Sequence, residues 1–203
     1  MVRKRDLKKE LKFLYGASAK NIREVDVPVM NFLMIDGEGD PNDSPAFGEA
    51  AETLFALSYT LKFAIKKGDM AIDYGVMPLE ALWWADDMKA FSTDDKSAWK
   101  WTAMIMQPGF IDADMVAQAM ATLQKGKNPA ALPLVRFETF DEGHSAQILH
   151  IGPFSEEGPT ISRLHAHIDA RTTRRGRHHE IYLSDIRRAA PQNWRTILRQ
   201  PMF

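Results

Sequence analysis

The feature that most constrains the fold is an order of elements that occurs twice along the 203-residue chain. In each copy an apolar strand precedes a glycine- and proline-containing turn, a helix, a strand with an internal glutamate and a strand led by tryptophan. The copies span about 25–110 and about 111–203, and Glu80 stands in the first where Glu180 stands in the second. Such self-similarity predicts an α+β fold, residues 1–203 forming one domain, in which strand–helix–strand–strand halves share an antiparallel sheet about a pseudo-two-fold axis.

Apolar periodicity and turn residues place the individual elements. In the first half we expect a strand at 30–35, a turn at 36–41, a helix from Ser44-Pro45 to Gly68, and strands at 79–84 and 99–107. In the second half we expect helices at 112–125 and 156–171 and strands at 134–140, 145–151, 178–183 and 194–199. Before both halves, within residues 1–20, the leucines of 5–15 recur at helical spacing, which predicts a short amphipathic helix on the domain surface.

Composition excludes several classes of protein. The chain is 45% hydrophobic and 26% charged with a net charge of −1, which is globular composition without a field that attracts nucleic acid or an anionic membrane. It has no cysteine, which excludes disulfides and thiolate chemistry. The basic N-terminus lacks the apolar run of a signal peptide, and no stretch approaches the length of a membrane span. We therefore expect a cytoplasmic protein.

Six segments of the chain are similar to one known family. They are FLMIDGEGDPN (32–42), YGVMPLEALWW (74–84), WKWTAMIMQP (99–108), LHIGPFSEEGPTISRLHAHI (149–168), HHEIYLSD (178–185) and RTILRQPM (195–202). On these segments the chain resembles the stand-alone GyrI-like small-molecule-binding family. The resemblance implies a tandem strand–helix–strand–strand (SHS2-type) fold with a concave groove for flat, lipophilic molecules.

The stand-alone branch of this family looks like enzymes that hydrolyse cyclopropane-bearing, DNA-alkylating toxins. Other relatives include drug-sensing domains of transcription regulators and a DNA-gyrase-inhibitor protein. Two features depart from the family pattern: Ile186 replaces an expected proline, and the turn before HHEIYLSD is rich in arginine. Those arginines are Arg171, Arg174, Arg175 and Arg177, which form a solvated loop or, alternatively, a contact for nucleic acid or an acidic partner.

Strand alternation sorts the candidate site residues. Residues 178, 180 and 182 share one face of their strand, and the apolar residues between them should face the helices. Glu180 and Tyr182 are therefore expected on the opposite, open face, with His178 near its edge. An open face that combines carboxylates with aromatic rings suits a flat ligand.

Each candidate has a predicted role. Glu180, which matches the family's central glutamate, is expected to act as general base or as counter-ion, and Tyr182 to donate a hydrogen bond to a ligand carbonyl. The remaining candidates are expected to contact the ligand: Trp84, Trp99, Trp101, Glu80, Tyr74 and His178, with Tyr59 as a further rim aromatic.

No cofactor is expected. His178 and His179 are adjacent on a strand and point to opposite faces, so they cannot ligate one metal ion together. The sequence has no phosphate-binding or dinucleotide-binding glycine pattern and no serine-nucleophile elbow.

Three functions remain open from the sequence. The first is hydrolysis of a strained ring in a planar lipophilic toxin by water that Glu180 deprotonates. The second is a module that sequesters drugs without turnover, and the third is an inhibitor of a protein partner such as gyrase. The near-neutral charge argues against a nucleic-acid partner.

Overall fold

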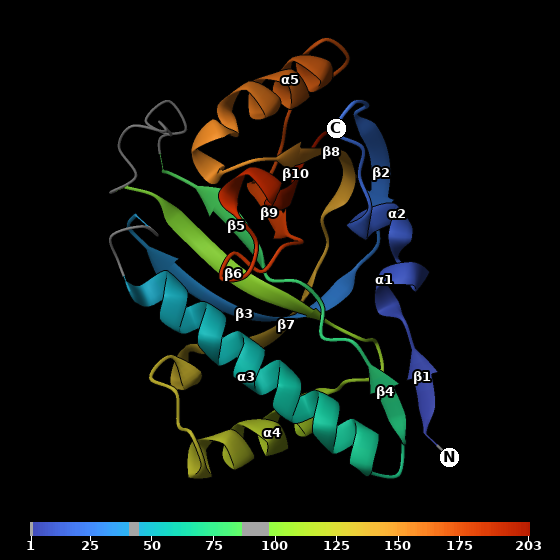
Figure 1. Ribbon diagram of the computed structural model, residues 1–203, viewed down its shortest axis with the longest axis vertical. Helices are drawn as coiled ribbons and strands as arrows, with labels where there is room; N and C mark the ends of the chain where they lie inside the picture. The colour runs from blue at the N-terminus through green and yellow to red at the C-terminus, as the bar shows by residue number, and fades with distance from the viewer. Residues whose placement is uncertain (1, 41–44, 87–97) are drawn as a thin grey trace.

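Figure 1 shows the computed structural model, which describes residues 2–40, 45–86 and 98–203. Its centre is an eight-stranded antiparallel sheet that curls into a half-barrel, with strand order β2-β8-β10-β9-β5-β6-β3-β7. The strands are β2 (Arg23–Val27), β3 (Met30–Glu38), β5 (Glu80–Trp84), β6 (Lys100–Gln107), β7 (Arg136–Phe140), β8 (Gly143–Ile151), β9 (His178–Tyr182) and β10 (Arg195–Pro201). Beside it, β1 (Arg3–Arg5) and β4 (Ile72–Tyr74) form a parallel pair.

The helices follow the expected order. They are α1 (Leu7–Glu10), α2 (Lys12–Tyr15), α3 (Pro45–Lys67), α4 (Ala113–Lys125) and α5 (Gly158–Asp169), with 3-10 turns η1 (Leu132–Leu134), η2 (Phe154–Glu156) and η3 (Pro191–Asn193). Asp112 caps α4, because its side chain accepts a hydrogen bond of 2.8 Å from the Met115 amide. The expected cap at Ser44 lies outside the described residues.

The tandem architecture is confirmed. The halves are β3-α3-β5-β6 and β8-α5-β9-β10, and they join where β5 pairs with β9. Each half also receives an edge strand from the other: β2 precedes β3 but pairs with β8, whereas β7 precedes β8 but pairs with β3. Neither half therefore completes its side of the sheet alone.

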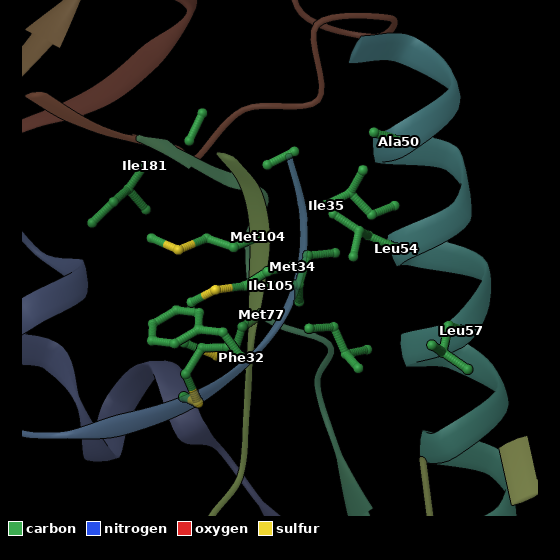
Figure 2. Close-up of a cluster of buried hydrophobic side chains, with 14 of the residues drawn as sticks. Phe32, Met34, Ile35, Ala50, Leu54, Leu57, Met77, Met104, Ile105 and Ile181 are labelled. Atoms are coloured by element: carbon green, nitrogen blue, oxygen red, sulfur yellow. The ribbon is translucent and has the colours of Figure 1, made fainter. Parts of the chain in front are cut away.

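Helices α3 and α5 cover the same face of the sheet, here called the helix face, which carries Ile35, Trp83, Trp101, Glu180 and Leu198. In Figure 2, Leu54 and Leu57 of α3 lie on one side of β3, next to Ile35. In the second half Leu198 joins a buried cluster with Leu164 and Ile168 of α5.

The other face, here called the N-terminal face, is also buried. Phe32, Met34, Met104 and Ile181 lie on the side of β3 and β6 away from α3 (Figure 2). The N-terminal segment covers part of this face with a set of buried side chains: Leu7, Leu14 and Tyr15. The prediction of one helix on the surface is therefore wrong, because the chain breaks into two short helices at Leu11 and its apolar residues join the core.

Two further differences concern strands. Strand β3 continues three residues beyond its expected end at Ile35, since Asp36, Gly37 and Glu38 still pair with β6. Strands β1, β2 and β4 were not predicted, although the burial of β2 alternates, with Val25 and Val27 buried.

Candidate ligand site on the helix face

Alternation along β9 places His178, Glu180 and Tyr182 on one face, as expected, but that face is the helix face. Glu180 lies directly opposite Leu198 of β10, which packs against α5. The prediction of an open face, away from the helices, is therefore wrong. It failed because both faces of β9 are buried: Ile181, on the other side, also belongs to the core, so an apolar residue does not mark the side that α3 and α5 cover.

A chain of hydrogen bonds fixes the Glu180 carboxylate. The Tyr182 hydroxyl donates to Glu180 Oε2 at 2.7 Å, and Trp83 Nε1 donates to the Tyr182 oxygen at 3.1 Å. Glu180 Oε1 lies 3.4 Å from His178 Nε2, and the Glu180 side chain is 11% exposed. Tyr182 thus orients the carboxylate, whereas the sequence predicted that it would donate to a ligand carbonyl.

Tyr182 holds its proton firmly. Burial raises its pKa well above the ordinary value, and the adjacent Glu180 charge raises it further. The hydroxyl therefore keeps its proton near pH 7 and donates it in the hydrogen bond to Glu180.

Aromatic rings from both halves of the chain form a connected set of contacts around Tyr182, the residue that orients this carboxylate. The ring pairs are Trp83 with Trp99 (5.6 Å between centroids), Phe47 with Trp83 (5.2 Å) and Trp101 (5.1 Å), and Phe154 with Tyr182 (5.6 Å) and Trp194 (4.9 Å). Strands, α3 and η2 all contribute to this aromatic wall. Its edge-to-face and tilted pairs are the favoured geometries for aromatic contacts.

Trp101 owes its position to a glycine in the neighbouring strand. Its indole lies over Gly37, the residue directly opposite in β3, where an added Cβ would stand 2.1 Å from the ring. A side chain at residue 37 would displace the indole, so this glycine belongs to the architecture of the aromatic wall.

Several buried polar atoms near Glu180 have no hydrogen-bond partner among the described residues. They include both ring nitrogens of His178, Nε2 of His165 and Oγ1 of Thr196, which lies opposite Tyr182. Burial, together with the Arg174 charge, lowers the pKa of His165 to about 4, so its ring is neutral near pH 7. Buried polar groups are nearly always satisfied, so this cluster is suited to water or to polar atoms of a ligand.

Similarity to known proteins identifies the family of this chain. Residues 20–201 match the GyrI-like small molecule binding domain. The chain belongs to that family.

Solved structures of two similar proteins from Listeria innocua support the same assignment. An uncharacterized conserved protein is 36% identical, with 98% of this chain and 99% of that chain covered and a TM-score of 0.89. A hydrolase is 35% identical, with 98% and 99% covered and a TM-score of 0.84. The EcmrR C-terminal domain, at 9% identity, 90% and 97% coverage and a TM-score of 0.55, shares the fold alone. No curated protein matches this chain.

In this GyrI-like chain Glu80 is not equivalent to Glu180. Glu80 pairs with Ile181 across the β5–β9 junction and so lies on the N-terminal face. There it accepts a hydrogen bond from Tyr15 at 2.7 Å on Oε1, and Oε2 lies 3.0 Å from His179 Nε2. The sequence predicted that Glu80 and Glu180 would occupy equivalent positions, and this prediction is wrong by one residue along the strand. A shift of one residue moves a side chain to the opposite face of the sheet.

Glu80 belongs to a fully buried ionic network. His179 Nδ1 lies 2.8 Å from Glu142, whose second oxygen accepts a bond of 3.0 Å from Arg199. Arg199 also donates to Gln147 and to the Leu14 carbonyl, at 2.9 and 2.7 Å. Each charged group here has specific partners, so the network is structural.

Charges within the network shift the pKa values of its members. Burial alone would lower the pKa of His179, but Glu142 and Glu80 raise it to about 9. Burial alone would raise the pKa of Glu142, but His179 and Arg199 hold it at about 2. Near pH 7 His179 is therefore a cation and Glu142 a carboxylate.

The predicted ligand contacts thus divide into two groups. His178, Trp99 and Trp101 lie on the helix face with Glu180 and Tyr182. Trp84 faces the other way, with the Arg177 guanidinium 3.5 Å from its ring centroid. Tyr74 belongs to β4 and contacts Phe110 at 5.5 Å, and Tyr59 is 47% exposed on α3.

Sequence reasoning missed Trp83, Phe154 and Thr196. Trp83 follows from the β5–β9 register, which places it opposite His178, but that register is a long-range pairing that local alternation does not give. Phe154 and Thr196 carry no local signal of a role.

The described parts of the chain contain neither a cluster of potential metal ligands nor a membrane-spanning helix. Residues 2–40, 45–86 and 98–203 contain no group of three or more potential metal-binding side chains. No helix within the same ranges is both long and apolar enough to span a membrane.

Proposed function

We propose that this GyrI-like protein binds flat, lipophilic molecules against the aromatic wall and hydrolyses an activated three-membered ring in them, with Glu180 as general base. The observation that carries this proposal is the state of the Glu180 carboxylate. One oxygen accepts a hydrogen bond from Tyr182, and the other lies 3.4 Å from Nε2 of His178, a ring without a hydrogen-bond partner among the described residues. A shielded carboxylate with one oriented oxygen that accepts no hydrogen bond from the described residues suits deprotonation of a water molecule.

Family membership and the Listeria hydrolase support the same reading. The aromatic wall would hold the planar body of the substrate by stacking and apolar burial. Holding substrate and water in one geometry would supply much of the rate acceleration.

The proposed step conserves atoms and electrons. Glu180 Oε1 accepts a proton from water as the water oxygen attacks a ring carbon. The strained carbon–carbon bond breaks, and its electron pair moves through the conjugated system to a carbonyl oxygen. That oxygen then takes the proton from Glu180, so the product is the substrate plus one water.

The test uses a spirocyclopropyl cyclohexadienone in ¹⁸O-labelled water. Wild-type protein should yield a ring-opened alcohol that carries the label, as measured by mass spectrometry. Glu180→Gln retains the shape and the Tyr182 contact but cannot accept the proton, so turnover should fall by about 10²–10⁴-fold. Glu49→Gln, an exposed carboxylate on α3, is the matched control and should keep full activity. Unchanged turnover in Glu180→Gln would exclude the general base.

A second function, sequestration without turnover, is favoured by one observation. A carboxylate shielded among tryptophan rings is also suited to a lipophilic cation, through charge and cation–π contacts. In that case wild-type protein forms no labelled alcohol, and Glu180→Gln weakens binding of tetraphenylphosphonium but not of a neutral planar ligand.

A further inference from the structure

A second groove, of about 730 Å³, lies on the N-terminal face at β3, β5, β6 and β7. Its lining includes apolar Met34, Leu82 and Trp84 and polar Asp36, Thr102 and Arg136. Glu180 projects from the other face of the same sheet, so this groove is separate from the proposed catalytic site. Its volume is typical of small-molecule pockets.

Two cations of this groove, Arg136 and Lys100, already pair with carboxylates. Asp36 accepts hydrogen bonds from Thr102 at 2.6 Å and from Arg136 at 2.8 Å, and Arg136 also pairs with Glu138. Lys100 forms an ion pair of 2.7 Å with Asp86. None of these cations has its charge free for a ligand.

Arg177 is different. Its guanidinium lies over Trp84, 3.5 Å from the ring centroid, and it makes no hydrogen bond or ion pair with any residue that the structure describes. The other arginines of the same turn have protein partners: Arg171 donates to the His167 carbonyl, Arg174 to Asp169 and Arg175 to the Glu142 and Met202 carbonyls. Stacking on Trp84 holds the Arg177 fork in one plane while leaving its N–H donors free.

The two groove arginines also differ electrostatically. Burial tends to lower the pKa of each, but Asp36 and Glu138 raise that of Arg136 above its ordinary value. For Arg177 burial prevails, and its pKa is lowered. The guanidinium remains charged near pH 7 and lacks a compensating carboxylate within ion-pair distance among the described residues.

We propose that this groove binds a flat aromatic anion, whose oxyanion group pairs with Arg177 while its ring rests on Leu82, Met34 and the edge of Trp84. A planar guanidinium matches a carboxylate or phosphate through two parallel hydrogen bonds. The apolar lining supplies contact area for a ring, and Arg177 is a cation of the groove whose donors an added anion can use.

The experiment titrates 1-naphthoate, 1-naphthyl phosphate and neutral 1-naphthamide into the protein by calorimetry. The Trp84 indole N–H resonance is followed by NMR, after assignment with Trp84→Phe. At least one anion should bind about ten-fold more tightly than the amide and shift the Trp84 signal. The tighter of the two anions identifies the class of natural ligand.

Arg177→Met removes the charge from an exposed side chain, so the fold should be retained and anion affinity should fall about ten-fold or more. Arg177→Lys keeps the charge without the planar fork and should bind with intermediate affinity, which separates recognition from a general loss of structure. Arg195→Met, another exposed arginine, and Glu180→Gln should both bind like wild type. The proposal would be overturned if Arg177→Met bound the anions as tightly as wild-type protein does. It would also be overturned if wild-type protein bound the anions and the amide with equal affinity.

Discussion

Glu80 and Glu180 are both buried carboxylates on adjacent, paired strands, yet their surroundings differ completely. Both oxygens of Glu80 have close partners, Tyr15 and the cationic His179, in a network whose charges are compensated. Glu180 has one oxygen fixed by Tyr182 and the other beside His178, whose ring nitrogens have no hydrogen-bond partner among the described residues. Burial is common to both carboxylates, so the feature that distinguishes the proposed general base is its unused hydrogen-bonding capacity.

The largest expected effect separates these two glutamates directly. Glu180→Gln should lower turnover by about 10²–10⁴-fold and change the free energy of unfolding by less than about 1 kcal/mol. Glu80→Gln should do the reverse, keeping turnover per folded molecule and destabilising by about 1–3 kcal/mol, because buried His179 loses a charged acceptor. Kinetics and urea denaturation of both variants test this. A comparable loss of turnover in Glu80→Gln would remove the distinction between the faces.

The next effect tests whether the network on the N-terminal face is structural. Arg199→Met should destabilise the protein by about 3–5 kcal/mol, because removal of one partner leaves Glu142 buried with less compensation. Arg195→Met, an exposed arginine four residues before Arg199 on the same strand, should lie within about 0.5 kcal/mol of wild type. If the two variants unfold at the same urea concentration, the network contributes no net stability.

The pH dependence of stability gives a smaller, signed effect. The pKa of His179 rises from 6.5 to about 9 on folding, so its stabilisation is complete below about pH 6.5 and is lost as pH rises through about 9. The difference in unfolding free energy between wild type and His179→Gln should therefore shrink across that window by up to ~3 kcal/mol. Arg195→Met should show the wild-type profile. A difference that is constant with pH would mean that His179 is not a buried cation.

The same two faces explain how far the sequence could be interpreted. The tandem order and most element positions were predicted, because they depend on local periodicity and on caps such as Asp112. Alternation also grouped Glu180 with Tyr182 correctly. It could not say which face the helices cover, because both faces are buried and apolar residues such as Ile181 occur on each.

Long-range pairing decided the remaining differences. The β5–β9 register sends Glu80 and Trp84 to the N-terminal face and brings Trp83 to the carboxylate, and no spacing within either strand encodes that register. Burial of Tyr15 likewise depends on Glu80, 65 residues further along the chain. Local patterns thus predicted the elements, while the composition of the site depended on contacts between the halves.

The smallest expected effect tests whether the helix face and the Arg177 groove act independently, and it uses Gly37. Asp36, Gly37 and Glu38 all line the groove, but a Cβ added at Gly37 would point to Trp101 on the helix face. Gly37→Ala places a methyl group against the indole, which should cost about 1–3 kcal/mol of stability by overpacking. Displacement of Trp101 should weaken the binding of a neutral planar ligand by the value of one aromatic contact, about 0.5–1.5 kcal/mol, and alter tryptophan fluorescence.

Affinity for 1-naphthoate should remain at the wild-type value, because Arg177 and Trp84 are on the other face. Gly48→Ala, in α3 with no atom near its added methyl group, controls for the substitution itself and should leave both affinities unchanged. If Gly37→Ala weakens both ligands equally, the two faces are coupled through β3 and cannot be treated as separate sites.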